Sequence, residues 1–154
     1  MGFAALVPLM AQAAAPNLQA GDLFRVEGDP GRAVYVVGPD MKRYWFPRED
    51  VYKTWFKGFS NVRIIQPQYV DAYSSGGGVA PRPGSFYLYK TVISPTVYAV
   101  LPGNVKVKLS SPEVAVALYG ANWGTYVRDW PDVFDSILAT GAPIASHGYR
   151  GGPF

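Results

Sequence analysis

Short runs of alternating apolar and polar residues, separated by glycine and proline, predict strands joined by tight turns. In the first half of the chain, strands are predicted over residues 23–26, 33–37, 42–46 and 62–65. Gly38-Pro39-Asp40 supplies the turn before the third strand. Val51 and Trp55 stand four positions apart, which predicts a short helix with one apolar face. A turn or helix that starts at a proline is expected over 67–73.

The second half shows the same order of elements. Strands are predicted over 86–89, 97–100, 105–109 and 126–128, with a proline-started turn or helix over 131–138. For its central helix, Ser111 is a candidate N-cap, Pro112 fits the first helical position and Gly120 can end the helix. The glycine-rich stretch from Ser74 to Gly78 is interpreted as the start of a linker between the halves.

An internal repeat accounts for the similarity of the two halves. A shift of 63 positions (21 to 84) aligns Gly21 with Gly84, Phe24 with Tyr87 and Val34-Tyr35 with Val97-Tyr98. One inserted residue near Gly120 changes the shift to 64 (67 to 131), which aligns Pro67 with Pro131, Asp71 with Asp135 and Gly77 with Gly141. The matches keep their order with a single insertion, so we infer a duplication.

The expected fold is α+β and strand-rich, with two tandem ββ(β)αβ repeat units packed as one pseudo-symmetric domain. A unit of about 60 residues buries too little apolar surface to be stable alone, so the pair should fold together. The 17 glycines, 14 prolines and 15% aromatic residues fit a turn-dense chain of strands. The predicted segments are a leader-like stretch (1–15), unit 1 with its linker (16–83), unit 2 (84–145) and a glycine-rich tail (146–154).

The third strand of each unit assigns the faces of the sheets. Lys106 and Lys108 cannot both lie in the core, so the alternate positions Val105, Val107 and Leu109 are predicted to point inward. By the repeat, Tyr44 and Phe46 also point inward, whereas Arg43 and Trp45 point outward.

An outward tryptophan beside an arginine is the main surface feature of the sequence. One interpretation is that Trp45 packs on the other unit or on the helix. The other is a contact surface of Trp45, Arg43, Lys106 and Lys108, because tryptophan and arginine are enriched at the energetic centres of interfaces. A basic and aromatic strand can also stack single-stranded nucleic acid, but the small net charge of +3 favours a solvated face.

Residues 1–15 are uncharged and mostly apolar, as in the second half of a secretory signal peptide. Ala11-Gln12-Ala13 offers a small-x-small cleavage site. The run is shorter than the roughly 20 residues that span a bilayer. The alternative is a short N-terminal helix that stays on the mature protein. We therefore expect export to the cell envelope or the extracellular space, without a transmembrane span.

The residue types leave little room for catalysis. The chain has no cysteine, so a disulfide framework and a thiolate zinc site are both excluded. The single histidine, His147, lies in the glycine-rich tail, where a Ser-His-Asp triad is not expected. We expect no catalytic residues, no metal site, no cofactor and no nucleic-acid partner.

Two groups of carboxylates are interpreted as helix caps. Asp129, Asp132 and Asp135 recur every three residues, and a hard cation such as calcium takes oxygen ligands of this type. The preferred interpretation is that they cap free N–H groups and complement the helix dipole. Glu49 and Asp50 open the first helix in the same way, and their adjacency does not set the separation that glycoside hydrolysis requires.

The tail contains two isolated rings, Tyr149 and Phe154. Tails of this composition are usually disordered. An extended segment with spaced anchors can instead add to the sheet edge of a neighbouring molecule, so both residues are candidate assembly contacts.

Three stretches together resemble a known repeat module. They are AVYVVGPDMKRYWFPREDVYKTWF (33–56), NVRIIQPQYVDAYSSGG (61–77) and TVYAVLPGNVKVKLSSPEVAVALYGANW (96–123). The module is an uncharacterised tandem-repeat module of predicted exported and cell-surface proteins of candidate-phyla, Parcubacteria-like bacteria. The resemblance covers about residues 21–144 and implies a surface protein, with no activity or catalytic residue to transfer. The second unit departs from the pattern at Val107-Lys108-Leu109, where an aromatic residue is common.

These observations predict a non-enzymatic exported module of the cell surface or envelope that acts in structure, adhesion or self-assembly. Its expected partners are like subunits or other envelope proteins. The alternative is a module that binds cell-wall glycan through Trp45 and Arg43.

Overall fold

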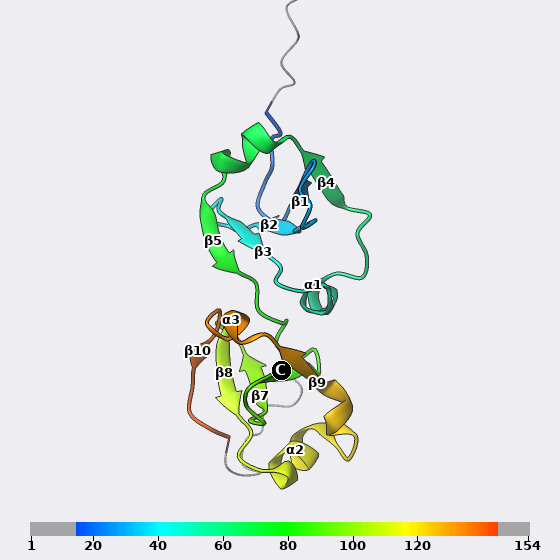
Figure 1. The fold of residues 1–154 in the computed structure, drawn as a ribbon, viewed down its shortest axis with the longest axis vertical. Helices are drawn as coiled ribbons and strands as arrows, with labels where there is room; N and C mark the ends of the chain where they lie inside the picture. Colours follow the sequence, from blue (N-terminus) through cyan, green and yellow to red (C-terminus); the bar gives the residue numbers. More distant parts are fainter. Residues whose placement is uncertain (1–14, 145–154) are drawn as a thin grey trace, which may run out of the picture.

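The computed structural model describes residues 15–144 of the 154-residue chain, which form an α+β, strand-rich fold (Figure 1). The first of its two five-stranded mixed sheets contains β1 (Leu23–Val26), β2 (Tyr35–Val37), β3 (Arg43–Trp45), β4 (Val62–Ile65) and β5 (Ser75–Gly78). The second contains β6 (Leu88–Thr91), β7 (Tyr98–Leu101), β8 (Val105–Lys108), β9 (Val127–Trp130) and β10 (Ala139–Thr140).

Both sheets have the same strand topology. The order is β4-β1-β2-β3-β5 in the first sheet and, read from the corresponding edge, β9-β6-β7-β8-β10 in the second. In each, the first strand pairs antiparallel with the second and parallel with the fourth, and the third pairs parallel with the fifth. This confirms the predicted repeat and its two pseudo-symmetric units.

The strand register changes which residues correspond. Leu23 pairs with Val36 and Val62, and Leu88 takes the same place opposite Ala99 and Val127, so Leu23 corresponds to Leu88. The predicted match of Phe24 with Tyr87 is therefore wrong by two positions. The shift is 65 here (23 to 88) but 63 in the third strands (43 to 106) and again 65 in the fourth (62 to 127). Between the two units, the loop before the second strand and the loop after the helix each differ in length. The predicted alignment with a single insertion therefore does not describe the repeat fully.

Each unit places one α-helix after its third strand. They are α1 (Glu49–Trp55) and α2 (Pro112–Tyr119), and the third and fourth residues of each helix are buried. The predicted caps of α2 are confirmed, because the Ser111 side chain accepts a hydrogen bond from the Val114 N–H at 3.3 Å and Gly120 ends the helix at a φ of 84°. The Trp55 side chain, predicted to be on the apolar face of α1, is 40% exposed and donates its indole N–H to the Ala80 carbonyl.

Short helical turns follow the fourth strands. They are η1 (Pro67–Ala72), a 3-10 helix, and α3 (Asp132–Asp135), while a further 3-10 turn, η2 (Trp123–Tyr126), follows α2. Each sheet therefore has an α-helix on one face and a short turn of helix on the other. Phe24, Val37 and Ile65 pack beneath η1 with Tyr73 and Leu18, while Ala99, Val107 and Leu109 pack beneath α2.

Burial on both faces corrects the predicted orientation of the third strand. Lys106, expected to point into solvent, is buried at 8% exposure beside Val107 at 3%. Lys108 is exposed, as predicted. The alternation of polar and apolar positions indicates one solvated face, but α3 covers the face that holds Lys106 and its carboxylate neutralises the ammonium group.

The glycine-rich stretch is a strand rather than a linker. β5 runs parallel to β3, with Ser75 opposite Arg43 and Gly78 opposite Trp45. Gly76 lies against Tyr44, so a Cβ on Gly76 would stand 2.3 Å from the Tyr44 ring. A Cβ on Gly141, directly after β10, would stand 2.8 Å from Val105 Cγ1 and 3.0 Å from Cγ1 of Val107, the equivalent of Tyr44. The absence of a side chain thus allows the chain at the sheet edge to pass close to its neighbour in both units.

Replacing Gly76 with alanine is therefore expected to lower the free energy of unfolding by about 1–2 kcal/mol, a usual cost of overpacking. The Tyr44 ring resists displacement because its hydroxyl donates to the Asp40 carboxylate at 2.9 Å. Urea denaturation followed by circular dichroism measures the change. Gly58→Ala is the matched control, because a Cβ on Gly58 would meet nothing within 4 Å. Equal midpoints for the two variants would contradict this packing argument.

The two units share a hydrophobic core. Its buried members include Phe46, Val51 and Tyr52 from the first unit and Tyr89 and Trp130 from the second. The chain between the units contributes to this core through Ala80, at 2% exposure. The pair is thus one folded body.

The predicted leader, apart from Ala15, and the tail with Tyr149 and Phe154 lie outside the described residues. Among residues 15–144, each helix is too short or too polar to cross a lipid bilayer.

Candidate functional site

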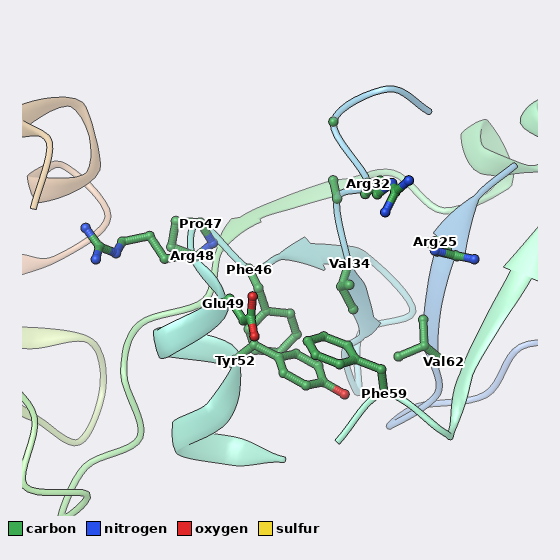
Figure 2. A pocket seen from close by; sticks show the side chains of 12 residues that line it. Arg25, Arg32, Val34, Phe46, Pro47, Arg48, Glu49, Tyr52, Phe59 and Val62 are labelled. Atoms are coloured by element: carbon green, nitrogen blue, oxygen red, sulfur yellow. The ribbon is translucent and has the colours of Figure 1, made fainter. Parts of the chain in front are cut away.

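A groove in the first unit lies between the β1–β2 connection and the start of α1 (Figure 2). Its volume is about 570 Å³. Aromatic, aliphatic and charged residues line it: Arg25, Gly31, Arg32, Ala33, Val34, Phe46, Pro47, Arg48, Glu49, Tyr52, Phe59 and Val62. Ligand sites are usually concave and combine apolar side chains with polar groups, and this groove has both kinds.

Three aromatic rings form the floor of this groove. Tyr52 and Phe46 are almost fully buried, whereas Phe59 is 46% exposed. Phe59 stacks on Tyr52 at a centroid distance of 4.5 Å and an interplanar angle of 7°. The Tyr52 hydroxyl donates to the Gly58 carbonyl at 2.7 Å, which holds the loop that carries Phe59. Burial raises the pKa of Tyr52, so its phenol stays protonated. The Tyr52 ring supports Phe59, whose exposed part is open to solvent.

Two arginines at the groove have no charged partner among the described residues. Arg25 extends from β1 and Arg32 from the β1–β2 connection, and both are exposed. Within residues 15–144, neither side chain takes part in an ion pair. Arg32 has a φ of 49°, a conformation that few residues other than glycine adopt. Figure 2 shows both guanidinium groups on the same side of the rings.

The other two charged residues of the groove are neutralised. Arg48 extends away from the rings in Figure 2 and donates to the Asp50 carboxylate at 2.8 and 3.0 Å and to the Asp129 carbonyl at 2.5 Å. The hydrogen bonds that Arg48 donates to Asp50 raise the pKa of Arg48. Glu49 pairs with Lys53 at 2.6 Å. The positive charge available to a ligand therefore comes from Arg25 and Arg32.

A smaller groove, of about 250 Å³, lies at the equivalent place in the second unit. Leu109, Ser111 and Ala115 stand where the first unit has Phe46, Arg48 and Tyr52, and Trp123 takes the place of Phe59. Lys108 is the cationic residue on its wall. The position of the groove is a property of the repeat, while its arginines belong to the first unit alone.

Arg43 and Trp45, predicted to form a contact surface, contact other parts of the same chain. Arg43 donates through Nη1 to the carbonyls of Val70 and Tyr73, at 2.6 and 2.5 Å, and lies 3.8 Å from the Asp71 carboxylate. Trp45 is half-buried and meets the ring of Phe134 edge-on at a centroid distance of 5.6 Å. Arg43 thus holds η1, and Trp45 contacts the second unit.

The predicted lysines separate in the same way. Lys106 pairs with Asp135 and lies 5.3 Å from the centre of the Tyr98 ring, while Lys108 is exposed. The four predicted contact residues therefore meet different parts of the fold.

The predicted carboxylate groups also have separate partners. Asp129 pairs with Lys90, and Asp135 accepts a hydrogen bond from the Tyr89 hydroxyl at 2.8 Å as well as from Lys106. Among the described residues, no three histidine, cysteine or carboxylate side chains gather as metal ligands would. The prediction that Asp135 caps a helix is replaced by a role in a partly buried ion pair with Lys106.

Comparison with known proteins found no matching family model, curated protein or solved structure. The groove itself escaped prediction because its walls come from segments that are far apart in the sequence. Its one local signal is a difference between the repeats, since Arg25 and Arg32 stand where the second unit has Lys90 and Pro95.

Proposed function

We propose that the protein is a non-enzymatic adhesion module of the cell envelope, and that the groove of its first unit binds an anionic glycan. The observation that carries this proposal is that one groove holds an exposed ring, Phe59, and two guanidinium groups that form no ion pair within residues 15–144. The uncharged, apolar leader sequence supports a location outside the cytoplasm.

The chemistry of the groove suits acidic sugars. A sugar ring presents C–H groups that pack on an aromatic face, which Phe59 offers on the support of Tyr52. Carboxylate and phosphate groups accept paired hydrogen bonds from the planar guanidinium group, which arginine forms better than lysine. A neutral glycan would leave Arg25 and Arg32 unused, so the proposed ligand bears carboxylate or phosphate groups.

The groove is poorly equipped for glycan cleavage. Glycosidases commonly place two carboxyl groups on either side of the scissile bond. Among the residues described as its lining, Glu49 is the one carboxylate, and it is paired with Lys53. The buried phenol of Tyr52 donates to a backbone carbonyl and is not available as a base. Binding without turnover is the proposal.

The test is calorimetry of the full chain with polygalacturonate, and with dextran as the neutral polymer. We expect binding to polygalacturonate alone, weakened by added salt because the attraction is between exposed charges. Arg25→Gln and Arg32→Gly should each lower the affinity about tenfold, roughly the loss of one charge-assisted hydrogen bond. Arg32→Gly keeps the fold because glycine adopts a positive φ without strain.

Arg128→Gln is the matched control, since Arg128 is an exposed arginine of the second unit that does not line the groove. Its affinity should equal that of the unchanged protein. Equal losses for all three arginine variants would indicate diffuse charge attraction and refute the assignment to the groove. Absence of binding to either polymer would refute the proposed ligand.

A further inference from the structure

The two units meet through unlike surfaces. Figure 1 shows α1 at the lower end of the first unit, toward the second, and α2 at the lower end of the second unit. At the upper end of the second unit, α3 faces the first, and η1 occupies the same upper position in the first unit. The units are thus stacked head to tail, with an α-helix end of one against a short-turn end of the next.

Within residues 15–144, this arrangement leaves two unlike ends uncovered. One is the α2 end of the second unit, and the other is the η1 end of the first. A contact between unlike surfaces does not close on itself, so a second copy can continue the stack.

We propose that the α2 end of one molecule docks on the η1 end of a second copy, with the internal junction as the template for this contact. Strand register fixes the equivalent residues on the two outer ends. β3 aligns with β8 by a shift of 63, whereas β4, β5 and the turn between them align with β9, β10 and α3 by a shift of 65. At the contact between two copies, Lys108 therefore takes the place that Trp45 has at the internal junction, and Tyr69 takes the place of Phe134.

The substituted pairs are complementary in charge and size. At the internal junction the Trp45 ring meets Phe134; between copies the Lys108 ammonium would meet the Tyr69 ring, a favourable cation–π contact. Asp71 is two residues from Tyr69; its carboxylate lies 3.8 Å from Arg43, but the side chain is 91% exposed and can meet a second cation. Internally Gly78 admits the Ile137 side chain, with 2.6 Å from a Cβ at Gly78 to Ile137 Cδ1.

Between copies the large and small partners exchange places. Pro143 takes the place of Gly78, and Ala72 takes the place of Ile137, so the ring of the proline would meet a small side chain. The contact between copies is weaker than the internal one, because Ser111 replaces Arg48, which donates to the Asp129 carbonyl inside the molecule. Glu113 and Asp22 would also approach each other, with Asp22 neutralised by Arg63 at 3.3 Å.

Cross-linking tests this contact sharply because the chain has no cysteine of its own. Full-length Ala72→Cys and Pro143→Cys variants are prepared separately, mixed and treated with a short bis-maleimide. A cross-linked dimer is expected in the mixture and not in either variant alone. The double variant should give a ladder of oligomers, because each molecule then carries both ends. Light scattering of the unmodified chain should show mass rising with concentration.

Lys108→Glu in the double variant should lower the yield of the ladder about tenfold, which corresponds to roughly 1.4 kcal/mol of association free energy. Lys57→Glu, another exposed lysine, is the control with an unchanged ladder. Circular dichroism confirms that each variant is folded. The proposal is overturned if the mixture yields no more dimer than the single variants, or if either single variant cross-links to itself as readily.

Discussion

Replacing Trp130 with alanine is expected to lower the free energy of unfolding by about 3–5 kcal/mol, the usual cost of truncating a buried tryptophan. Trp130 is 0% exposed and lies 4.6 Å from the Tyr89 ring and 6.3 Å from the Phe134 ring, centroid to centroid. The core that it joins also contains Val51 and Tyr52 of the first unit. Because the cavity opens in this shared core, both units should lose stability together. Urea denaturation followed by fluorescence and circular dichroism measures the change.

Two further variants separate packing from polarity. Trp130→Phe keeps most of the ring but loses the hydrogen bond from the indole N–H to the Tyr87 hydroxyl, at 2.8 Å, and should cost about 1–2 kcal/mol. Val133→Ala, at a side chain 71% exposed, should change stability by less than about 0.5 kcal/mol. Two separate unfolding transitions in Trp130→Ala, with the first unit as stable as before, would contradict a shared core.

Removing the carboxylate of Asp135 is expected to cost about 3 kcal/mol, because it leaves the buried ammonium of Lys106 without its partner. Asp135→Ala also removes the acceptor of the Tyr89 hydroxyl, whose pKa is raised by burial and by this hydrogen bond. Removing both charges in Lys106→Met with Asp135→Leu should restore most of the loss, because an apolar pair of similar size needs no counter-charge. Denaturation of both variants and of the unchanged protein at pH 7 measures both effects.

The exposed pair of Lys90 and Asp129 provides the control. Their side chains are 38% and 64% exposed, so Asp129→Ala should cost less than about 1 kcal/mol. If Asp135→Ala cost no more than Asp129→Ala, the buried pair would not stabilise the fold in the way inferred.

Local chemistry explains which elements could be predicted. The strand Leu23–Val26 and the strand Val62–Ile65 have the predicted bounds, because each is a short apolar run between turn residues. The helix after Ser111 has its predicted cap and its predicted end at Gly120, since both signals act within a few residues. The duplication was also predictable, because two copies of one pattern keep the same order of turns and strands.

The errors lie where one segment meets another. Ser75–Gly78 has the composition of a flexible linker, and its place beside β3 depends on the close approach of Gly76 to Tyr44. Lys106 has the sequence context of an exposed strand residue, and its burial depends on a carboxylate 29 positions away. The groove joins Arg25 to Phe59 through tertiary structure. A sequence pattern that extends over a few residues carries no information about contacts between such distant segments.

The sequence by itself determined the α+β character, the two repeats, the turns and the helix caps, because hydrophobic period, glycine, proline and capping side chains act locally. The tertiary structure decided the two-sided burial of each sheet, the head-to-tail order of the units and the groove, whose Arg25 and Arg32 form no ion pair within residues 15–144. These features depend on which surfaces meet, and many pairings of amphipathic elements satisfy the same local pattern. Only packing at close range, where a missing Cβ or a buried charge changes stability by kilocalories, selects among them.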